Sequence, residues 1–323
     1  MSEPGRVCPL RYRYGAQALA HAEPRTADTL YVIGGLYGNL PALDAIERMV
    51  RAEVTMPALC FNGDFNWFNV ADHDFAEINQ RVLANDAILG NVEAELDAPA
   101  DDVGCGCAYP DSVDAGTVDR SNRIHARLKA TAQRHHHLLA HIARLPMFAR
   151  YQVGGCRVGV VHGDAESLAG WRFDVNAMDD ARAAPWLHSA FEASKVDLFA
   201  STGTCLPALR RFDFGSHRES WVCNNGAAGM PNFTNDLAGL CTRIGTSPSP
   251  HSVLDEVRIA GSYVALLPVR FDADRWRTEF LAQWPPDSPA WSSYFERITH
   301  GTAFTREQAL APASELACTP SSP

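Results

Sequence analysis

The chain has 323 residues, 46% of them hydrophobic, with 28 Lys and Arg against 38 Asp and Glu and a formal charge of -10. This length and apolar content are enough for a buried core in one large domain or two modest ones, which excludes a disordered chain. The acidic balance argues against broad binding to nucleic acid or to an anionic membrane, because phosphate contacts need clustered Lys and Arg.

Neither a membrane span nor a disulfide framework is predicted. No apolar run reaches the roughly 20 residues that span a bilayer, and the N-terminus lacks a basic stretch followed by a hydrophobic one, so we predict a cytoplasmic protein. Nine cysteines are too sparse for a disulfide scaffold, and the odd number leaves at least one unpaired. Reduced thiols are therefore expected.

The first predicted unit is a strand, a loop and a helix. Thr29–Ile33 is a short, partly β-branched apolar run that ends at Gly34 and Gly35, as a buried strand entering a loop would. Beyond Pro41, apolar residues recur at helical spacing, with the proline near the helix start.

A second unit of the same kind follows directly. It comprises a strand at 58–61, a loop over 62–69, a helical stretch at 75–83 and a short strand at 87–89. Open α/β sheets place their sites at the C-terminal ends of such strands, so the residues after each strand are candidates for function.

The middle of the chain is irregular and then helical. Residues 97–122 are rich in Pro, Gly, Asp and Cys, which is typical of a long ordered loop or a cap. Within it, Cys105 and Cys107 are interpreted as ordinary free thiols, because a zinc knuckle has two residues between its cysteines and a second pair elsewhere. Residues 122–145 then predict one helix ended by Pro146.

That predicted helix contains the run His135-His136-His137. Three successive side chains on a helix point in three directions, and only His137 and His141 share a face. We therefore favour a solvated stretch over a second metal site.

Further apolar runs predict the remaining strands. Arg157–Val161 ends at His162, and Val196–Ala200 leads into the loop 201–207. Residues 224–231 form either a tight turn or a run of N–H groups that cradles an anion, and both readings stay open. The last strand is expected at 262–270, and the tail 311–323 is expected to be loosely ordered.

Five segments spread in order over residues 29–233 resemble the motifs of the calcineurin-like metallophosphoesterases. They are Thr29–Asn39, Asn62-Gly63-Asp64, Gly90-Asn91-Val92-Glu93, Val158–Asp164 and Ser201–Pro207. The resemblance implies an α/β fold in which a two-sheet β-sandwich is flanked by helices, with a metal centre at the strand ends.

The resemblance also implies that one of the family's two metal positions has lost its ligands. Gly35 and Tyr37 stand where the Asp and His of the first motif are expected. Only the bridging Asp64 and Cys205, which replaces the last motif's second histidine, remain for that metal. Since two-metal sites clamp both reacting oxygens between ions roughly 3.5–4 Å apart, the usual pair is not expected here.

The second metal position is better preserved. The resemblance assigns it Asp64, Asn91 and His162, while Gly203 replaces its remaining histidine and Val92 replaces the histidine that usually helps to protonate the leaving group.

Three functional hypotheses follow. In the first, the protein is a divergent hydrolase of a phosphoester or related bond, with one ion on Asp64, Asn91, His162 and, if its thiolate joins, Cys205. The Asn ligand favours Mn, Mg or Fe, with Zn if the thiolate takes part. His162 or Asp164 would assist proton transfer.

The second hypothesis is a metal-independent enzyme in which Cys205 is the nucleophile and His162 its base. The third is a catalytically silent protein that binds a phosphate-like ligand or a partner. In an active enzyme, the phenol of Tyr37 would donate to a substrate oxygen, although packing is an equal interpretation. The preferred hypothesis is the metal-dependent hydrolase acting on a small-molecule phosphoester.

The predicted domain organisation has three parts. Residues 1–28 form an N-terminal extension, 29–272 the metallophosphoesterase-like domain with an insertion or cap at 97–145, and 273–323 a C-terminal helical segment and tail.

Overall fold

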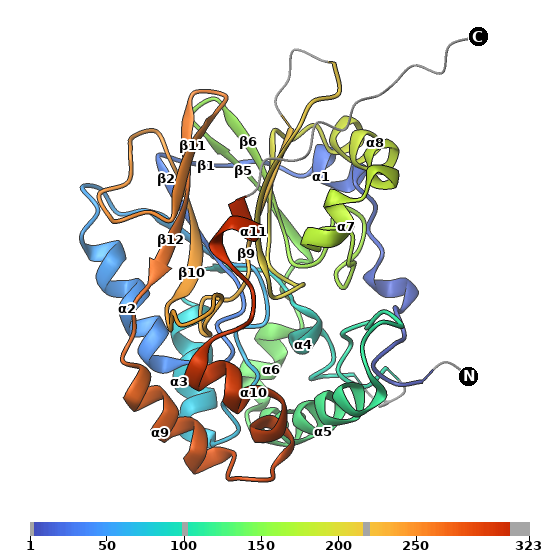
Figure 1. The fold of residues 1–323 in the computed structure, drawn as a ribbon, viewed down its shortest axis with the longest axis vertical. Helices are drawn as coiled ribbons and strands as arrows, with labels where there is room; N and C mark the ends of the chain where they lie inside the picture. Colours follow the sequence, from blue (N-terminus) through green and yellow to red (C-terminus); the bar gives the residue numbers. More distant parts are fainter. Residues whose placement is uncertain (1–2, 99–102, 216–219, 311–323) are drawn as a thin grey trace.

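The computed structural model describes residues 3–98, 103–215 and 220–310. Two six-stranded mixed sheets pack face to face and helices cover their outer faces (Figure 1). This arrangement confirms the predicted two-sheet β-sandwich flanked by helices. The predicted tail at 311–323 and Cys318 lie outside the described residues.

The first sheet contains most of the predicted early strands. Its strands, in spatial order, are β11 (Asp255–Ile259), β12 (Ser262–Val269), β10 (Gly239–Gly245), β2 (Thr29–Ile33), β3 (Ala58–Phe61) and β4 (Asp86–Ala87). The β2–β3 and β3–β4 pairs are parallel, so their C-terminal ends meet at one edge.

The second sheet carries the later motif strands. Its spatial order is β1 (Arg25–Ala27), β5 (Phe148–Val153), β6 (Cys156–Val161), β7 (Leu198–Ser201), β9 (Ser220–Asn225) and β8 (Pro207–Phe212). Here β6, β7 and β9 run parallel. Strand β1, from the predicted N-terminal extension, pairs with β5 and so belongs to this sheet.

Successive side chains of β2 point alternately between the two sheets and outward to the helices. Leu30 and Val32 of β2 point between the sheets and meet Val158 and Val160 of β6 in one buried cluster. The intervening side chains of β2 face outward against helices, because successive strand residues point to opposite faces.

Helices cover the outer faces of the sandwich and one of its ends. Helices α2 (Leu40–Arg51) and α3 (Asp72–Val82) cover the first sheet, and α1 (Gln17–His21), α7 (Val175–Asp179) and α8 (Ala184–Ser194) cover the second. Helix α2 starts where expected, because the side chain of Asn39 accepts the N–H of Ala42 at 2.9 Å.

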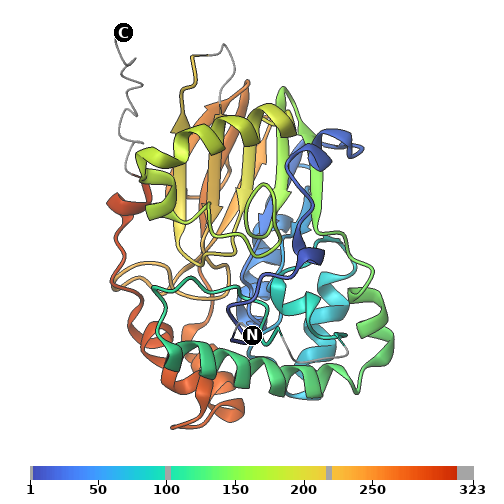
Figure 2. The same ribbon diagram turned by 90° about the vertical axis from the view of Figure 1, so that its right-hand side faces the viewer.

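A separate group of helices gathers at the strand-end side of the sandwich (Figures 1 and 2). It contains α5 (Ala115–Ala132), α6 (His136–Ile142), α9 (Ala273–Gln283) and α10 (Pro289–His300). We call these four helices, α5, α6, α9 and α10, the cover.

The remaining elements are short. They are α4 (Asn91–Ala94), α11 (Arg306–Leu310) and the 3-10 turns η1 (Leu10–Tyr12) and η2 (Ala181–Ala183).

The single helix predicted over 122–145 is wrong, since two helices, α5 and α6, occupy this region. Between the two helices the backbone of His135 is not helical, with φ -113° and ψ 59°, and Arg134 and His135 both bind the carboxylate of Asp72, at 2.9 and 3.0 Å. The side chains of His136, His137 and His141 are exposed, as expected for a solvated stretch.

Two further sequence predictions can be compared with the structure. The eight cysteines within the described residues are free thiols. Across residues 3–98, 103–215 and 220–310, no helix combines the length and apolarity that crossing a membrane requires.

Candidate functional site

Residues at the ends of three strands converge on one buried point. Asp64 follows β3, Asn91 opens α4 just after β4, and His162 follows β6. The Nε2 atom of His162 lies 3.0 Å from Oδ1 of Asn91 and 3.4 Å from Oδ1 of Asp64. We call Asp64, Asn91 and His162 the Asp64 cluster; none of the three is more than 5% exposed.

Hydrogen bonds determine which atoms of the Asp64 cluster carry protons. Both ring nitrogens of His162 face oxygens that can only accept: Nδ1 lies 2.9 Å from the carbonyl of Asn62 and Nε2 lies 3.0 Å from Oδ1 of Asn91. Because the backbone carbonyl cannot turn away, we place the hydrogen of a neutral ring on Nδ1. Burial lowers the pKa of His162, which keeps the ring neutral and leaves Nε2 as a lone pair.

The amide of Asn91 is oriented in a similar way. Its nitrogen donates to the carbonyl of Cys105 at 3.1 Å and approaches Sγ of Cys107 at 3.4 Å, so its oxygen faces His162. Three lone-pair atoms, Nε2 and two Oδ1, thus meet without a hydrogen between them. A cation or one additional proton would relieve their mutual repulsion.

The carboxylates near this point are strained electrostatically. Burial raises the pKa of Asp64 to about 7, although the N–H of Val92 partly offsets this. Burial and the neighbouring Asp64 raise the pKa of Glu93 to about 7 as well. Both shifts mean that a positive charge placed here would be favourable.

Glu93 holds the loop that presents Asp64. Its carboxylate accepts the backbone N–H groups of Asp64 at 2.8 Å, Asn66 at 3.0 Å and Gly90 at 3.2 Å. These bonds stabilise the left-handed backbone of Asp64, whose φ is +51°. Sequence reasoning left Glu93 without a role, and the structure makes it a positioning residue.

Side chains occupy the place that the sequence resemblance assigns to the first metal. A Cβ added at Gly35 would lie 2.9 Å from Cε2 of Tyr37, so the phenol ring occupies the space beside Gly35. The phenol oxygen lies 2.8 Å from Sγ of Cys205. Burial, followed by Cys205 and Asp64, raises the pKa of Tyr37 well above its ordinary value, so the phenol stays protonated.

The remaining predicted site residues are placed differently from one another. Among the hydrogen bonds of the described residues, Cys205 pairs with Tyr37 and with the carbonyl of Gly203, and none joins it to His162. Burial raises the pKa of the Cys205 thiol, which disfavours a thiolate.

The carboxylate of Asp164 is used within its own loop. It accepts the N–H groups of Glu166, Ser167 and Arg172 at 2.9, 3.1 and 3.3 Å. Its predicted part in proton transfer remains untested, and its observed contacts are those of a residue that shapes a loop.

The sequence did not indicate that Arg297 and Cys107 lie beside this site. Arg297 of α10 donates to the carbonyl of Cys205 at 3.1 Å, and its positive charge acts to lower the pKa of Tyr37. Cys107 approaches Asn91 from the segment before α5. No local pattern marks Arg297, because it lies 92 residues beyond Cys205 in the chain.

The cover closes over the site with aromatic side chains. Phe68, which packs in the same buried cluster as Tyr37, meets Phe280 and Tyr294 at ring distances of 5.1 Å each. The side chains nearest the surface in this region, Cys107 and Arg297 among them, are half-buried. The Asp64 cluster is thus almost fully enclosed, with 5% of Asp64, 5% of Asn91 and 0% of His162 exposed.

The anion-cradle interpretation of residues 224–231 is wrong. The N–H groups of Ala228 and Gly229 donate to the carbonyls of Gly34 and Gly35, at 2.8 and 3.0 Å. The N–H of Ala227 donates to Oδ1 of Asn232 at 2.9 Å. These donors fasten the loop to the first motif and are unavailable to an anion.

The donor set fits a divalent cation only in part. Within the described ranges, no group of three or more His, Cys, Asp or Glu side chains is arranged to hold a metal ion. The set that does converge contains one carboxylate, one amide oxygen and one imidazole. Such oxygen and imidazole donors suit Mn, Fe or Mg better than a thiolate-rich zinc site.

Comparison with known proteins identifies the fold. No family model and no curated protein matches the chain. The solved structure of a metallophosphoesterase from Sphaerobacter thermophilus is similar, with 16% identity and a TM-score of 0.55 over 85% of this chain and 100% of that one. A hypothetical protein from Pyrococcus horikoshii is 13% identical, with a TM-score of 0.55 over 86% of this chain and 100% of its own.

These similarities show that the chain has the mixed α/β fold of metallophosphoesterases. At such low identities they carry no information about activity, which has to be argued from the site.

Proposed function

We propose that the protein is a divergent metallophosphoesterase-like hydrolase that cleaves a phosphoester or related bond with a single divalent ion on Asp64, Asn91 and His162. The observation that carries this proposal is the meeting of three lone-pair atoms at 3.0 and 3.4 Å around Nε2 of His162. A divalent ion at this point would activate a water molecule and polarise a phosphoryl oxygen.

The chain's own residues would have distinct parts in this activity. His162 is fixed in one tautomer by the carbonyl of Asn62, and Glu93 holds the backbone of Asp64. The positive charge of Arg297, beside Tyr37 and Cys205, would attract an anionic substrate. Tyr37 would donate its phenolic hydrogen to a substrate oxygen after leaving Cys205.

A catalytically silent binding protein is the main alternative, and two observations favour it. The first metal position is filled by Tyr37, and the site lies under the aromatic cover of Phe68, Phe280 and Tyr294. The metal-independent Cys205 enzyme has less support, because Cys205 is paired with Tyr37 instead of with His162.

Metal analysis separates these proposals. We would measure binding of Mn, Fe, Zn and Mg to the wild type, Asp64→Ala and His162→Ala, with His137→Ala, which changes an exposed histidine, as the control. Loss of a direct ligand should weaken binding by more than the roughly 100-fold seen for outer partners of a metal site. The His137→Ala variant should bind like the wild type.

Activity would be screened in parallel on p-nitrophenyl phosphate and its bis-ester. Turnover that needs the metal and vanishes in Asp64→Ala supports the hydrolase, whereas metal binding without turnover supports the silent protein. A wild type that binds none of the four ions and stays inactive with each of them contradicts the proposal. Metal-independent turnover that Cys205→Ser abolishes would support the thiol enzyme.

A further inference from the structure

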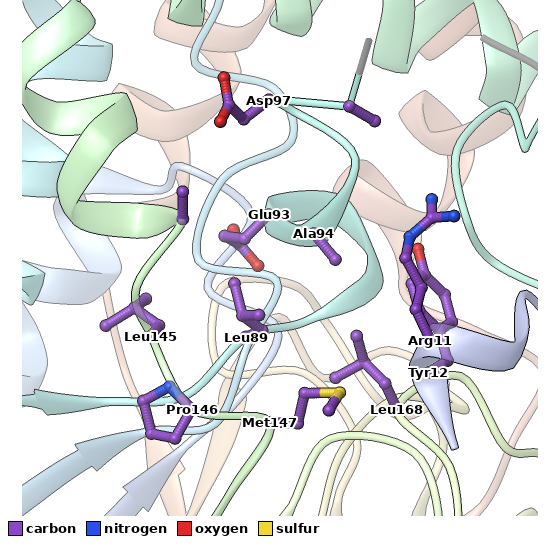
Figure 3. Close-up of a pocket in the computed structure, with 12 residues that line it drawn as sticks. Arg11, Tyr12, Leu89, Glu93, Ala94, Asp97, Leu145, Pro146, Met147 and Leu168 are labelled. Atoms are coloured by element: carbon purple, nitrogen blue, oxygen red, sulfur yellow. The ribbon is translucent and has the colours of Figure 1, made fainter. Parts of the chain in front are cut away.

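A cavity of about 700 Å³ lies beside Glu93 and Ala94 of α4 (Figure 3). Helix α4 contributes to both sites, since Asn91 belongs to the Asp64 cluster while Glu93 and Ala94 line the cavity. The volume lies within the roughly 300–1,000 Å³ range of small-molecule sites.

The cavity has a continuous apolar wall. Figure 3 shows Leu89, Leu145, Pro146, Met147 and Leu168 along one side, with polar side chains opposite and above them. These side chains come from the end of β4, the connection between α6 and β5, and the loop after β6. An apolar body is therefore the main feature that a ligand must have.

The charged groups around the cavity differ in whether they already have partners. Nη2 of Arg11 lies 2.6 Å from the buried carboxylate of Glu95, so its charge is compensated. Lys129 of α5 donates to the carbonyl of Ala98, the lining residue that follows Asp97, at 2.7 Å.

The two lining carboxylates are not equivalent. That of Glu93 accepts the N–H groups of the Asp64 loop and is almost inaccessible. Asp97 is exposed, and within the described residues it makes no hydrogen bond or ion pair. Among the described residues that line the cavity, the charged group without a partner is thus the carboxylate of Asp97. In Figure 3 it lies away from Arg11.

We propose that this cavity binds an organic ammonium ion with an apolar body, the ammonium group beside Asp97 and the body against Leu89, Met147 and Leu168. A carboxylate of the same shape would meet Asp97 and the field of Glu93, and it would find Arg11 already paired. The proposal does not depend on the metal-dependent hydrolase activity.

The test is a titration of the full chain with n-hexylamine, n-hexanol and n-hexanoate, in the presence of a chelator, by calorimetry or chemical-shift changes. We expect hexylammonium to bind at least fivefold more tightly than hexanol, and hexanoate more weakly than both. In Asp97→Asn the advantage of hexylammonium over hexanol should disappear. The matched control Asp111→Asn should retain it, since Asp111 is also exposed and makes no hydrogen bond or ion pair with the part of the chain that the structure describes.

A second variant tests the place of binding. Ala94→Phe fills the cavity without changing its charge, so it should weaken hexylammonium and hexanol alike by at least fivefold, with an unchanged circular dichroism spectrum as the check on folding. Hexanoate binding as tightly as hexylammonium overturns the proposed ligand class. Equal behaviour of Asp97→Asn and Asp111→Asn, or undiminished binding to Ala94→Phe, overturns the proposed site.

Discussion

Asp64→Asn should make the metal-free protein more stable at alkaline pH while removing its metal affinity. The substitution deletes a charge and keeps the oxygen that accepts the N–H of Val92. Burial raises the pKa of Asp64 from 3.8 to about 7 and, together with Asp64, that of Glu93 from 4.5 to about 7. An acid with a raised pKa in the folded state loses its proton more readily when the chain unfolds.

The sign of the pH dependence follows from this difference. Between their unfolded pKa values and about 7, Asp64 and Glu93 bind more protons in the native state than in the unfolded state, so their contribution to the free energy of unfolding falls as pH rises. For Asp64 alone the shift corresponds to about 4 kcal/mol at about 1.36 kcal/mol per pKa unit. Local relaxation and water entry reduce such penalties, so we expect a gain of about 2–4 kcal/mol at pH 8 and a smaller gain at pH 5.

Urea denaturation with a chelator at pH 5 and pH 8 measures this effect, with Asp111→Asn as the control for loss of an exposed charge. Adding Mn to the wild type at pH 8 should restore stability, because an ion that binds only the folded state stabilises it. The reasoning is refuted if Asp64→Asn is less stable than the metal-free wild type at pH 8, or if the gain from the substitution is no larger at pH 8 than at pH 5.

The other predictions concern the groups around the site and the core. Tyr37→Phe removes the phenol–thiol contact with Cys205, so it should lower the free energy of unfolding by about 0.5–1.5 kcal/mol in urea titrations and leave Mn affinity within about twofold. Arg243→Met leaves the buried carboxylate of Glu53, held at 2.7 and 3.1 Å, without its cation, so it should cost about 3–5 kcal/mol at pH 7. Burial would raise the pKa of Glu53, but hydrogen bonds from Arg243 and Tyr31 more than offset this and lower it. The stabilisation by this ion pair is therefore present above the unfolded pKa of 4.5 and is lost on acidification. If Arg243→Met destabilises the protein as much at pH 3 as at pH 7, this account is contradicted. Phe68→Ala leaves a cavity under the cover and should cost about 3–5 kcal/mol, with faster proteolysis of α9 and α10 than in the wild type; equal cleavage rates would show that Phe68 does not hold the cover.

Much of the fold could be predicted because its signals are local. The apolar runs that became β2, β3, β6 and β12 are contiguous in sequence, and each is long enough to be recognised alone. The helix at 122–145 was predicted wrongly because no proline or glycine marks its break at residues 133–136, where Arg134 and His135 contact Asp72, a residue about 60 positions away.

Part of the candidate site was likewise predictable from local sequence, and part depends on contacts between distant residues. By itself the sequence determined that Asp64, Asn91 and His162 each follow a strand, although His162 follows β6 of the other sheet, so parallel pairing accounts only for the meeting of Asp64 and Asn91. It also determined that Gly35 and Tyr37 cannot supply the ligands of a first metal.

Only the tertiary structure decided what replaces those ligands and what surrounds them. The phenol of Tyr37 meets Cys205 across 168 residues, Arg297 arrives from a C-terminal helix, and Asp164 turns its carboxylate to its own loop. These outcomes depend on which distant side chains share a buried volume. That is a property of packing between elements, whereas strand and loop signals reside within a few neighbouring residues.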